Sequence, residues 1–384
     1  MTKVSLFKCD DYHLEDLKAI IQKSFEALGG LNNLINESDV VFLKVNAVSN
    51  LPSHLGYTTN PIFLKAMIQV VKETGCKIIV GDNPPFHNLK KTLKGNGMLA
   101  ICEEEQVEIC DNTILTTITN DQNFHYSSFE VSKQMIDCDV LINLPKLKTH
   151  ALTYFSGAVK NYFGLIYGLE KAKWHVKASD PATFSAMIAD LYGAVTYTFR
   201  DKVLLNFCDG VIALEGEGPT TGGKARQLGA ILASKDAVAL DAVCLKLANL
   251  EIEKSPITLA AMKADLGTGD IEKINIIGDS LDSFNTKLVE PQKTHPGMKI
   301  LKYQWMKNIL LELPKINKNL CIKCGECTKI CPPQTLKIKN GNYPTLKNSR
   351  CIRCWCCAEV CTKGAITKGK RPLLGRIIMS KAGK

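Results

Sequence analysis

The chain has 384 residues, of which 45% are hydrophobic and 22% charged, and its formal net charge is +10. This is the composition of a soluble globular protein, and the length favours one large domain with a smaller one, because a single core rarely serves so long a chain. No uncharged apolar run of about 18 residues exists and the N-terminal segment lacks the apolar stretch of a signal peptide, which excludes a transmembrane segment and predicts a cytoplasmic protein.

Residues 1–285 alternate strand-like with helix-like segments. Strand patterns occur at 4–7, 40–46, 76–85, 139–145, 202–214, 229–234 and 274–279. Helical patterns occur between several of them, at 14–28, 61–73, 181–197 and 236–249. Asn60 before Pro61 is typical of a helix start. The alternation predicts an α/β fold, with a mostly parallel sheet covered by helices on both faces and functional side chains at the carboxyl ends of its strands.

The alternation stops at residues 286–316, which we expect to form a linker with one amphipathic helix. Leu301, Trp305 and Ile309 would share a face of it, either packed on the large domain or lying at a membrane interface. A basic tail at 370–384 ends the chain, and after Cys361 there are seven Lys or Arg and no acidic residue. Such a tail is either solvated and mobile or docked on an acidic partner or a membrane surface.

Sixteen cysteines without an export signal indicate metal or redox use rather than disulfides. Residues 318–368 contain an internal duplication, in which each cysteine of one C-x2-C-x2-C-x3-C run has a partner 30 positions later. The runs are Cys321, Cys324, Cys327, Cys331 and Cys351, Cys354, Cys357, Cys361. In such a run the first three thiolates wrap one [4Fe-4S] cluster, and the fourth binds the other cluster.

The predicted ligand sets are therefore crossed. One cluster takes Cys321, Cys324, Cys327 and Cys361, and the other takes Cys351, Cys354, Cys357 and Cys331. Residues 317–369 resemble the bacterial two-cluster ferredoxin domain, although Thr362 stands where that family has proline after the second run. Two four-cysteine zinc sites, the alternative, would not need the third spaced cysteine of each run. Cys356, which aligns with Glu326, is either a buried bystander or a thiol that tunes a cluster.

Polar residues gather after two strands of the predicted large domain. The stretch 143–150 (NLPKLKTH) is followed by Lys160, Asn161, Lys171, Lys173 and His175. Lysines and a histidine at a strand end before a helix form a natural anion site. The loop 215–223 (EGEGPTTGG) has glycines that permit close backbone approach and carboxylates suited to binding metal or moving protons. Either pattern alone also fits an ordinary turn or surface loop.

Together these motifs resemble the DUF362 family, whose function is uncharacterised and many of whose members carry a C-terminal ferredoxin domain. The resemblance rests on LKVN at 43–46, GDNP at 81–84, NLPKLKTH at 143–150, GAVKNYFG at 157–164 and the loop after DGVIAL. It covers roughly residues 40–250. It implies a candidate pocket of ten residues. Within it we expect His150, Lys148 and Lys160 to be catalytic and Lys44, Asn46, Asp82, Lys146, Asn161, Glu215 and Gly218 to bind the substrate. No activity comes with the family name.

Two adjacent clusters indicate a short electron wire. We expect an iron–sulfur oxidoreductase that exchanges single electrons between a redox partner protein and an anionic substrate or cofactor, with His150 as proton donor. The alternatives are a ferredoxin-like carrier whose large domain only docks a partner, and a scaffold that the clusters merely stabilise. The chain lacks a dinucleotide fingerprint, which argues against a nicotinamide, and no motif indicates a flavin, although the residues leave one open. Dispersed lysines without interleaved aromatics argue against nucleic acid.

Overall fold

The computed structural model describes residues 1–384 apart from 86–87, 121–124, 169, 292–302, 340 and 382–384. Its described residues include a ten-stranded sheet with the order β12-β1-β11-β10-β7-β2-β3-β4, and β8 pairs with β10 and β9 beside this path. The strands of this sheet are β1 (Thr2–Lys8), β2 (Val40–Lys44), β3 (Lys77–Gly81), β4 (Glu108–Ile109), β7 (Val140–Asn143), β8 (Lys146–His150), β9 (Tyr154–Ser156), β10 (Val203–Gly216), β11 (Gly223–Ser234) and β12 (Ile274–Gly278).

The sheet is mostly parallel. Successive neighbours from β10 through β7, β2 and β3 to β4 run parallel, and so do β1 and β12. β11 is the exception on this path, because it runs antiparallel to both β1 and β10. The short loop 217–222 joins β10 to β11, and strands joined by a hairpin must run in opposite directions. The predicted α/β class with a mostly parallel sheet is confirmed.

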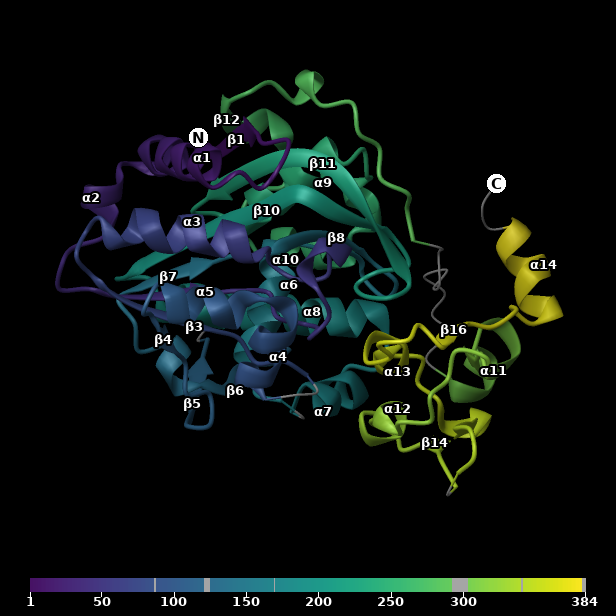
Figure 1. Ribbon diagram of the computed structural model, residues 1–384. Coiled ribbons are helices and arrows are strands. Elements are labelled where there is room, and N and C mark those ends of the chain that lie inside the picture. The colour runs from purple at the N-terminus through teal and green to yellow at the C-terminus, as the bar shows by residue number, and fades with distance from the viewer. Residues whose placement is uncertain (86–87, 121–124, 169, 292–302, 340, 382–384) are drawn as a thin grey trace.

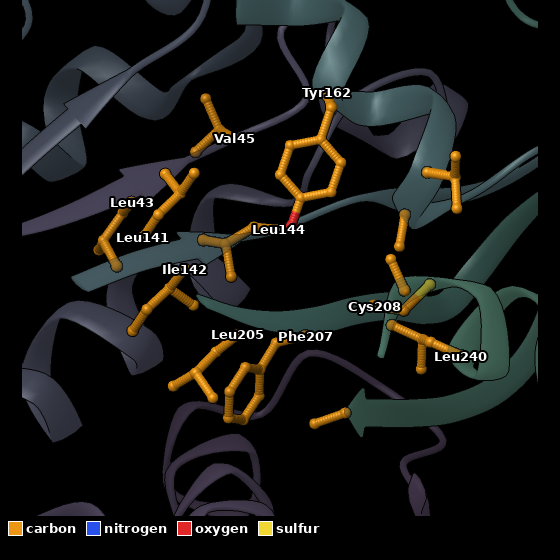
Figure 2. Packing of buried hydrophobic residues seen from close by; sticks show 14 of the residues in the cluster. Leu43, Val45, Leu141, Ile142, Leu144, Tyr162, Leu205, Phe207, Cys208 and Leu240 are labelled. Atoms are coloured by element: carbon orange, nitrogen blue, oxygen red, sulfur yellow. The ribbon is translucent and has the colours of Figure 1, made fainter. Parts of the chain in front are cut away.

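Helices cover both faces of the sheet (Figure 1). α1 (Leu14–Leu28) packs on α3 (Pro61–Lys72), whereas α10 (Pro256–Lys263) packs on α8 (Pro181–Thr198) and α9 (Ala237–Leu247). Phe207 and Cys208 are adjacent on β10 and point to opposite sides of it (Figure 2). The ring centroid of Phe207 lies 4.7 Å from that of Phe25 on α1, while the Cys208 thiol hydrogen-bonds with Cys244 on α9.

The predicted helix start before Pro61 is confirmed, because the Asn60 Oδ1 atom accepts a hydrogen bond of 2.8 Å from the Ile62 amide. The shorter elements lie at the rims of the sheet and in the C-terminal part of the chain. They are α2 (Leu31–Leu34), α4 (Leu89–Asn96), α5 (Met98–Glu104), β5 (Leu115–Thr119), β6 (Ser128–Ser132), α6 (Ala158–Asn161), α7 (Glu170–Lys177), α11 (Gln304–Leu310), β13 (Pro314–Ile316), α12 (Glu326–Lys329), β14 (Leu336–Lys337), β15 (Thr345–Leu346), α13 (Cys356–Glu359), β16 (Ile366–Lys368) and α14 (Leu373–Lys381).

The sequence duplication is also present in the backbone of residues 313–368, here called the cysteine-rich segment. α12 and α13 begin 30 residues apart. A step of 30 residues also takes β13 to β15 and β14 to β16, so the strand pair β13–β16 corresponds to the pair β14–β15. Lys323 and Arg353 have φ angles of 59° and 61°, and the equivalent pair Gly325 and Trp355 has 81° and 64°. Positive φ is uncommon outside glycine, so its recurrence at matching positions shows two copies of one loop conformation.

The predicted linker helix is α11, and its apolar face is not packed on the large sheet. Trp305 is 60% and Ile309 40% exposed, whereas Lys307 and Leu310 are buried. Leu301, the third residue expected on this face, lies outside the described residues. α11 packs instead on α14, which forms within the predicted basic tail. Among the described residues, no helix combines the length and the apolar character needed to cross a membrane.

Candidate functional site

A chain of amide side chains crosses β2, β7 and β10. Asn46 donates to Asn161 at 2.7 Å, Asn161 donates to Asn143 at 2.7 Å, and Asn143 donates to Asn206 at 2.9 Å. Asn46 lies two residues after the end of β2, and Asn143 is the last residue of β7. The amides therefore lie at the carboxyl edge of these strands, where parallel sheets of this class bind their ligands.

A pocket lies beside these amides, and its walls come from distant parts of the chain. One wall carries three lysines and two histidines, namely Lys148, His150, Lys160, Lys171 and His175. The other includes Ile330, Cys356 and Glu359 of the cysteine-rich segment. Asn46, Asp82 and Asn161 also line the pocket. Six of the ten predicted residues of the large domain therefore share one cavity, in which lysine and histidine side chains outnumber the carboxylates of Asp82 and Glu359.

Two of the pocket lysines are poised near neutral pH. Lys148 donates to Asn46 Oδ1 at 2.7 Å and to the Tyr57 carbonyl at 2.9 Å, and burial together with Lys160 lowers its pKa to about 7. Burial also lowers the pKa of Lys171 to about 7, although its ammonium donates to the Asn83 carbonyl. An amine with such a pKa can bind an anion when protonated and can also transfer a proton at neutral pH.

His150 is held neutral by its surroundings. Its Nδ1 atom accepts a hydrogen bond of 3.1 Å from the Leu152 amide, which places the ring proton on Nε2. Nε2 faces the Glu359 carboxylate at 3.8 Å. Burial, reinforced by Lys160 and Lys148, lowers the pKa of His150 well below its usual range. The imidazole is therefore better suited to donate a hydrogen bond into the pocket than to release a proton.

Lys44 and Lys146, two predicted substrate-binding residues, do not line this pocket. The Lys44 ammonium is fully buried and lies 2.9 Å from Asp82 Oδ1. The Lys146 ammonium is likewise buried, 2.9 Å from Asp209 Oδ2. Both lysines are thus held in buried ion pairs, and only Asp82 among these four residues also lines the pocket. A Cβ at Gly164 would collide with Asp82, which explains the glycine at this position of the motif.

Breaking one of these pairs should destabilise the protein strongly. Asp209→Asn leaves the Lys146 ammonium buried without its carboxylate, and we expect the free energy of unfolding to fall by about 3–5 kcal/mol. Urea denaturation followed by circular dichroism measures this loss. The double variant Lys146→Met/Asp209→Leu removes both charges and should recover most of it. A loss under about 1 kcal/mol in the single variant would contradict the assignment of a buried pair.

The loop 215–223 docks the cysteine-rich segment. Thr220 and Thr221 donate through their hydroxyls to the carbonyls of Glu359 and Cys361, each at 3.1 Å. Glu217 forms an ion pair with Lys368. The two predicted substrate-binding residues of this loop have structural contacts: Glu215 accepts a hydrogen bond of 3.0 Å from the Val289 amide, and a Cβ on Gly218 would collide with the Thr149 carbonyl.

The eight duplicated cysteines fall into two groups. Cys321, Cys324, Cys327 and Cys361 line one cavity of the cysteine-rich segment, and we call them the first cluster site. Cys357 lies within electrostatic range of Cys354, Cys351 and Cys331, and also of Cys327 from the first group. Cys351 in turn lies near Cys354 and Cys331, and we call Cys331, Cys351, Cys354 and Cys357 the second cluster site. Each group contains three thiols from one run and one from the other. The crossed ligand sets assign the thiols in the same way, and cluster binding by these two groups stays a prediction.

Backbone amides point at equivalent sulfurs in both groups. The Thr335 amide donates to Cys331 Sγ and the Ala365 amide to Cys361 Sγ, each at 3.2 Å. Such bonds stabilise a thiolate ligand and tune a cluster. In the described part of the chain, no three His, Cys, Asp or Glu side chains converge as ligands of a single metal ion do. A [4Fe-4S] cluster does not need such convergence, since each thiolate binds a different iron.

The sequence model of a family described as "Domain of unknown function (DUF362)" matches residues 41–246, more than half of the chain. The chain belongs to the DUF362 family. The match agrees with the resemblance at residues 40–250. In this DUF362 protein, residues 313–336 match a 4Fe-4S binding domain, so an iron–sulfur segment follows the family domain. That match includes the first cysteine run only.

One curated relative of this DUF362 protein is the "Thylakoid-associated protein sll1697" of Synechocystis sp. It is 33% identical over 262 residues, which are 68% of this chain and 78% of the relative. Among solved structures, the lactate racemase apoprotein of Thermoanaerobacterium thermosaccharolyticum is similar with a TM-score of 0.42 and 14% identity. The similarity covers 65% of this chain, and the chain spans 58% of that structure.

Four titratable residues of the pocket in this DUF362 protein are outside the predicted catalytic and substrate-binding sets, although Lys171 and His175 belong to the polar residues that predict an anion site. Lys171 and His175 are four residues apart on α7 and thus share a helix face, a signal that was available in the sequence. Glu359 and Cys356 had no such signal, because the pocket wall they form depends on how the cysteine-rich segment docks. Cys356 is buried and hydrogen-bonds with Cys354, a member of the second cluster site, which favours the tuning interpretation over the bystander.

Proposed function

We propose that this protein passes single electrons between a redox partner and an anionic molecule in the pocket, by way of two [4Fe-4S] clusters. When bound, each cluster would accept and release one electron at a time. The observation that carries the proposal is the shared wall of the pocket. Ile330 and Cys356 line it, and each is adjacent in sequence to a member of the second cluster site, Cys331 or Cys357.

The residues that would hold the clusters are the two groups of thiols. Cys321, Cys324, Cys327 and Cys361 would hold one, and Cys331, Cys351, Cys354 and Cys357 the other. The cavity lined by the first group and the amide donors to Cys331 and Cys361 support this assignment. We propose domain boundaries near residues 285, 316 and 369, with the linker at 286–316 and the basic tail at 370–384.

We propose that the lysines, rather than His150, manage the charge and the proton of the bound molecule. Lys148, Lys160 and Lys171 would bind its anionic group. A protonated Lys148 is the better acid at neutral pH, because its pKa is about 7 whereas that of His150 is well below its usual range. His150 would orient the molecule through Nε2–H. Glu359 of α13 reaches the pocket from the opposite wall, and its carboxylate offsets part of the positive charge of the lysines.

The test is whether an anion in the pocket affects the second cluster selectively. Oxalate, a small dianion, added to anaerobically purified protein should lower the reduction potential of one cluster and alter its electron paramagnetic resonance signal. The other cluster should respond less, because the added charge is farther away. Lys160→Met should abolish the shift, while Lys263→Met, at an exposed position of α10, should leave it intact. Equal shifts of both clusters, or none, would contradict the proposal.

The second candidate is a ferredoxin-like carrier in which the large domain only docks a partner. The docking contacts of Thr220, Thr221 and Glu217 favour it, since they attach the cysteine-rich segment without any role for the pocket. It predicts normal cluster reduction and no response to oxalate. A purely structural role for the clusters predicts that neither is reduced at any accessible potential.

We propose that the protein is cytoplasmic and contacts a membrane only at the membrane surface. The relative from Synechocystis is named as thylakoid-associated. In this chain Trp305 on α11 and Leu373 and Leu374 at the start of α14 are exposed, and residues after Cys361 carry only positive formal charge. Such residues suit the interface of an anionic membrane. A flavin is not part of this proposal, because no motif in the sequence indicates one.

A further inference from the structure

The two cysteine loops, equivalent in sequence, differ in their exposure. In the first, Cys324 is exposed, Leu320 is 48% exposed and Ile322 is 60% exposed. In the second, Cys351 and Arg353 are 6% and 3% exposed. The two loops therefore share a backbone conformation but not the same exposure. Only the first loop exposes large apolar side chains, those of Leu320 and Ile322, to solvent.

α11 explains the difference, because it covers the second loop. The Gln304 side chain donates to the Cys351 carbonyl at 2.8 Å, and Arg353 donates to Asn308 Oδ1 at 2.9 Å. Arg353 also donates to the Glu312 carbonyl at 3.0 Å. The first loop has Lys323 at the position of Arg353, and Lys323 is exposed. Three cysteines of the second cluster site are thus buried and the fourth, Cys354, is half-buried, whereas the first site includes the exposed Cys324.

The exposed loop is surrounded by positive charge. Residues 313–350 contain eight Lys or Arg and one acidic residue, Glu326, which pairs with Lys329 at 2.8 Å. Lys315, Lys318 and Lys323 are exposed, and Lys323 lies over the Tyr343 ring at 4.6 Å. Lys363 lines the cavity of the first cluster site. A small apolar centre within a basic rim is suited to a partner with an apolar centre and an acidic rim.

We infer that Leu320, Ile322 and the lysines around them form the docking surface for a small acidic protein that carries a one-electron centre. This inference rests on the proposed function and gives the wire a direction. With clusters bound, the carrier would be oxidised by one electron and the cluster held by Cys321, Cys324, Cys327 and Cys361 would be reduced by one. That electron would then pass to the second cluster, which Cys331, Cys351, Cys354 and Cys357 would hold beside the pocket wall.

The test uses an acidic two-cluster bacterial ferredoxin as the carrier and the full-length holoprotein. Calorimetry measures binding, and stopped-flow absorbance measures the second-order rate of electron transfer from the reduced ferredoxin. Binding and rate should both weaken with added salt. Lys323→Glu and Ile322→Glu should each lower both by about tenfold or more at low salt, because they reverse a rim charge or bury a carboxylate in the contact.

Two controls separate this inference from the proposed function. Lys263→Glu, the same charge change on α10, should alter neither quantity. Reduction by dithionite, a small ion, should be unchanged in the loop variants, which shows that the clusters are intact. Unaltered binding and rates in both loop variants would overturn the inference while leaving the oxalate response of the second cluster untouched. Loss of self-association in the variants would instead identify the loop as a contact between copies of the chain, and would also overturn it.

Discussion

Replacing Cys321 and Cys361 together by alanine should leave about four iron atoms per chain, whereas replacing Cys321 and Cys331 together should leave almost none. The first pair belongs to one cluster site, so its loss spares the other site. The second pair removes one ligand from each site. Iron analysis and the electron paramagnetic resonance of reduced, anaerobically purified protein provide the count.

If each run instead holds its own cluster, replacing Cys321 and Cys361 removes almost all iron, whereas replacing Cys321 and Cys331 leaves about four iron atoms. That result would contradict the crossed ligand sets. Cys356→Ala is the matched control, since Cys356 lies within the second run but outside both sites, and it should retain about eight irons. Circular dichroism of each variant separates cluster loss from unfolding. The large sheet contains none of these cysteines, so its signal should persist in all variants.

The sequence predicts those features of the fold that depend on residues close together in the chain, and it predicts less well those that depend on contacts between distant residues. The spacing of eight cysteines depends on a local loop conformation, and the matching φ angles of Lys323 and Arg353 show that conformation twice. The strand and helix pattern of residues 1–285 follows from hydrophobic periodicity, which is also local. The antiparallel direction of β11 does not follow from local periodicity, because it depends on the hairpin loop 217–222, whose residues also fit a metal or proton-transfer site.

The candidate pocket was predictable only in part, for the same reason. His150, Lys148, Lys160 and Asn161 lie close together in sequence and share the cavity. Lys146, Lys148 and His150 alternate along β8, and this spacing predicts that all three side chains point to the same face. Lys146 nevertheless pairs with Asp209, about sixty residues away, and does not line the pocket. Glu359 joins the pocket from the other end of the chain. Partners so distant leave no mark on local spacing.

Lys171→Met should weaken the binding of oxalate by about 10- to 100-fold, because it removes a charge-assisted contact worth roughly 1.5–3 kcal/mol. Lys173→Met should have little effect. Lys173 is two residues away on the same helix, but it is exposed and pairs with Glu170 outside the pocket. Calorimetry on the oxidised protein provides both affinities. Equal losses in the two variants would mean that oxalate responds to the net charge of α7 and not to the pocket.

The same binding should weaken as the pH rises through about 7, the pKa to which burial lowers both Lys148 and Lys171. Below that pH both amines are protonated and attract the anion, and above it the protons are lost. Oxalate stays a dianion from about pH 6 to pH 9, so the change must come from the protein. The groups that act on the two lysines are Lys44, Asp82, Lys146, Lys160 and Glu359. Asp82 and Glu359 raise their pKa values and the lysines lower them, and a bound dianion raises them further. The pH at which the two amines are half-protonated should therefore lie above 7 in the oxalate complex and return towards 7 as oxalate is diluted. An affinity for oxalate that does not change with pH would contradict the role of these amines.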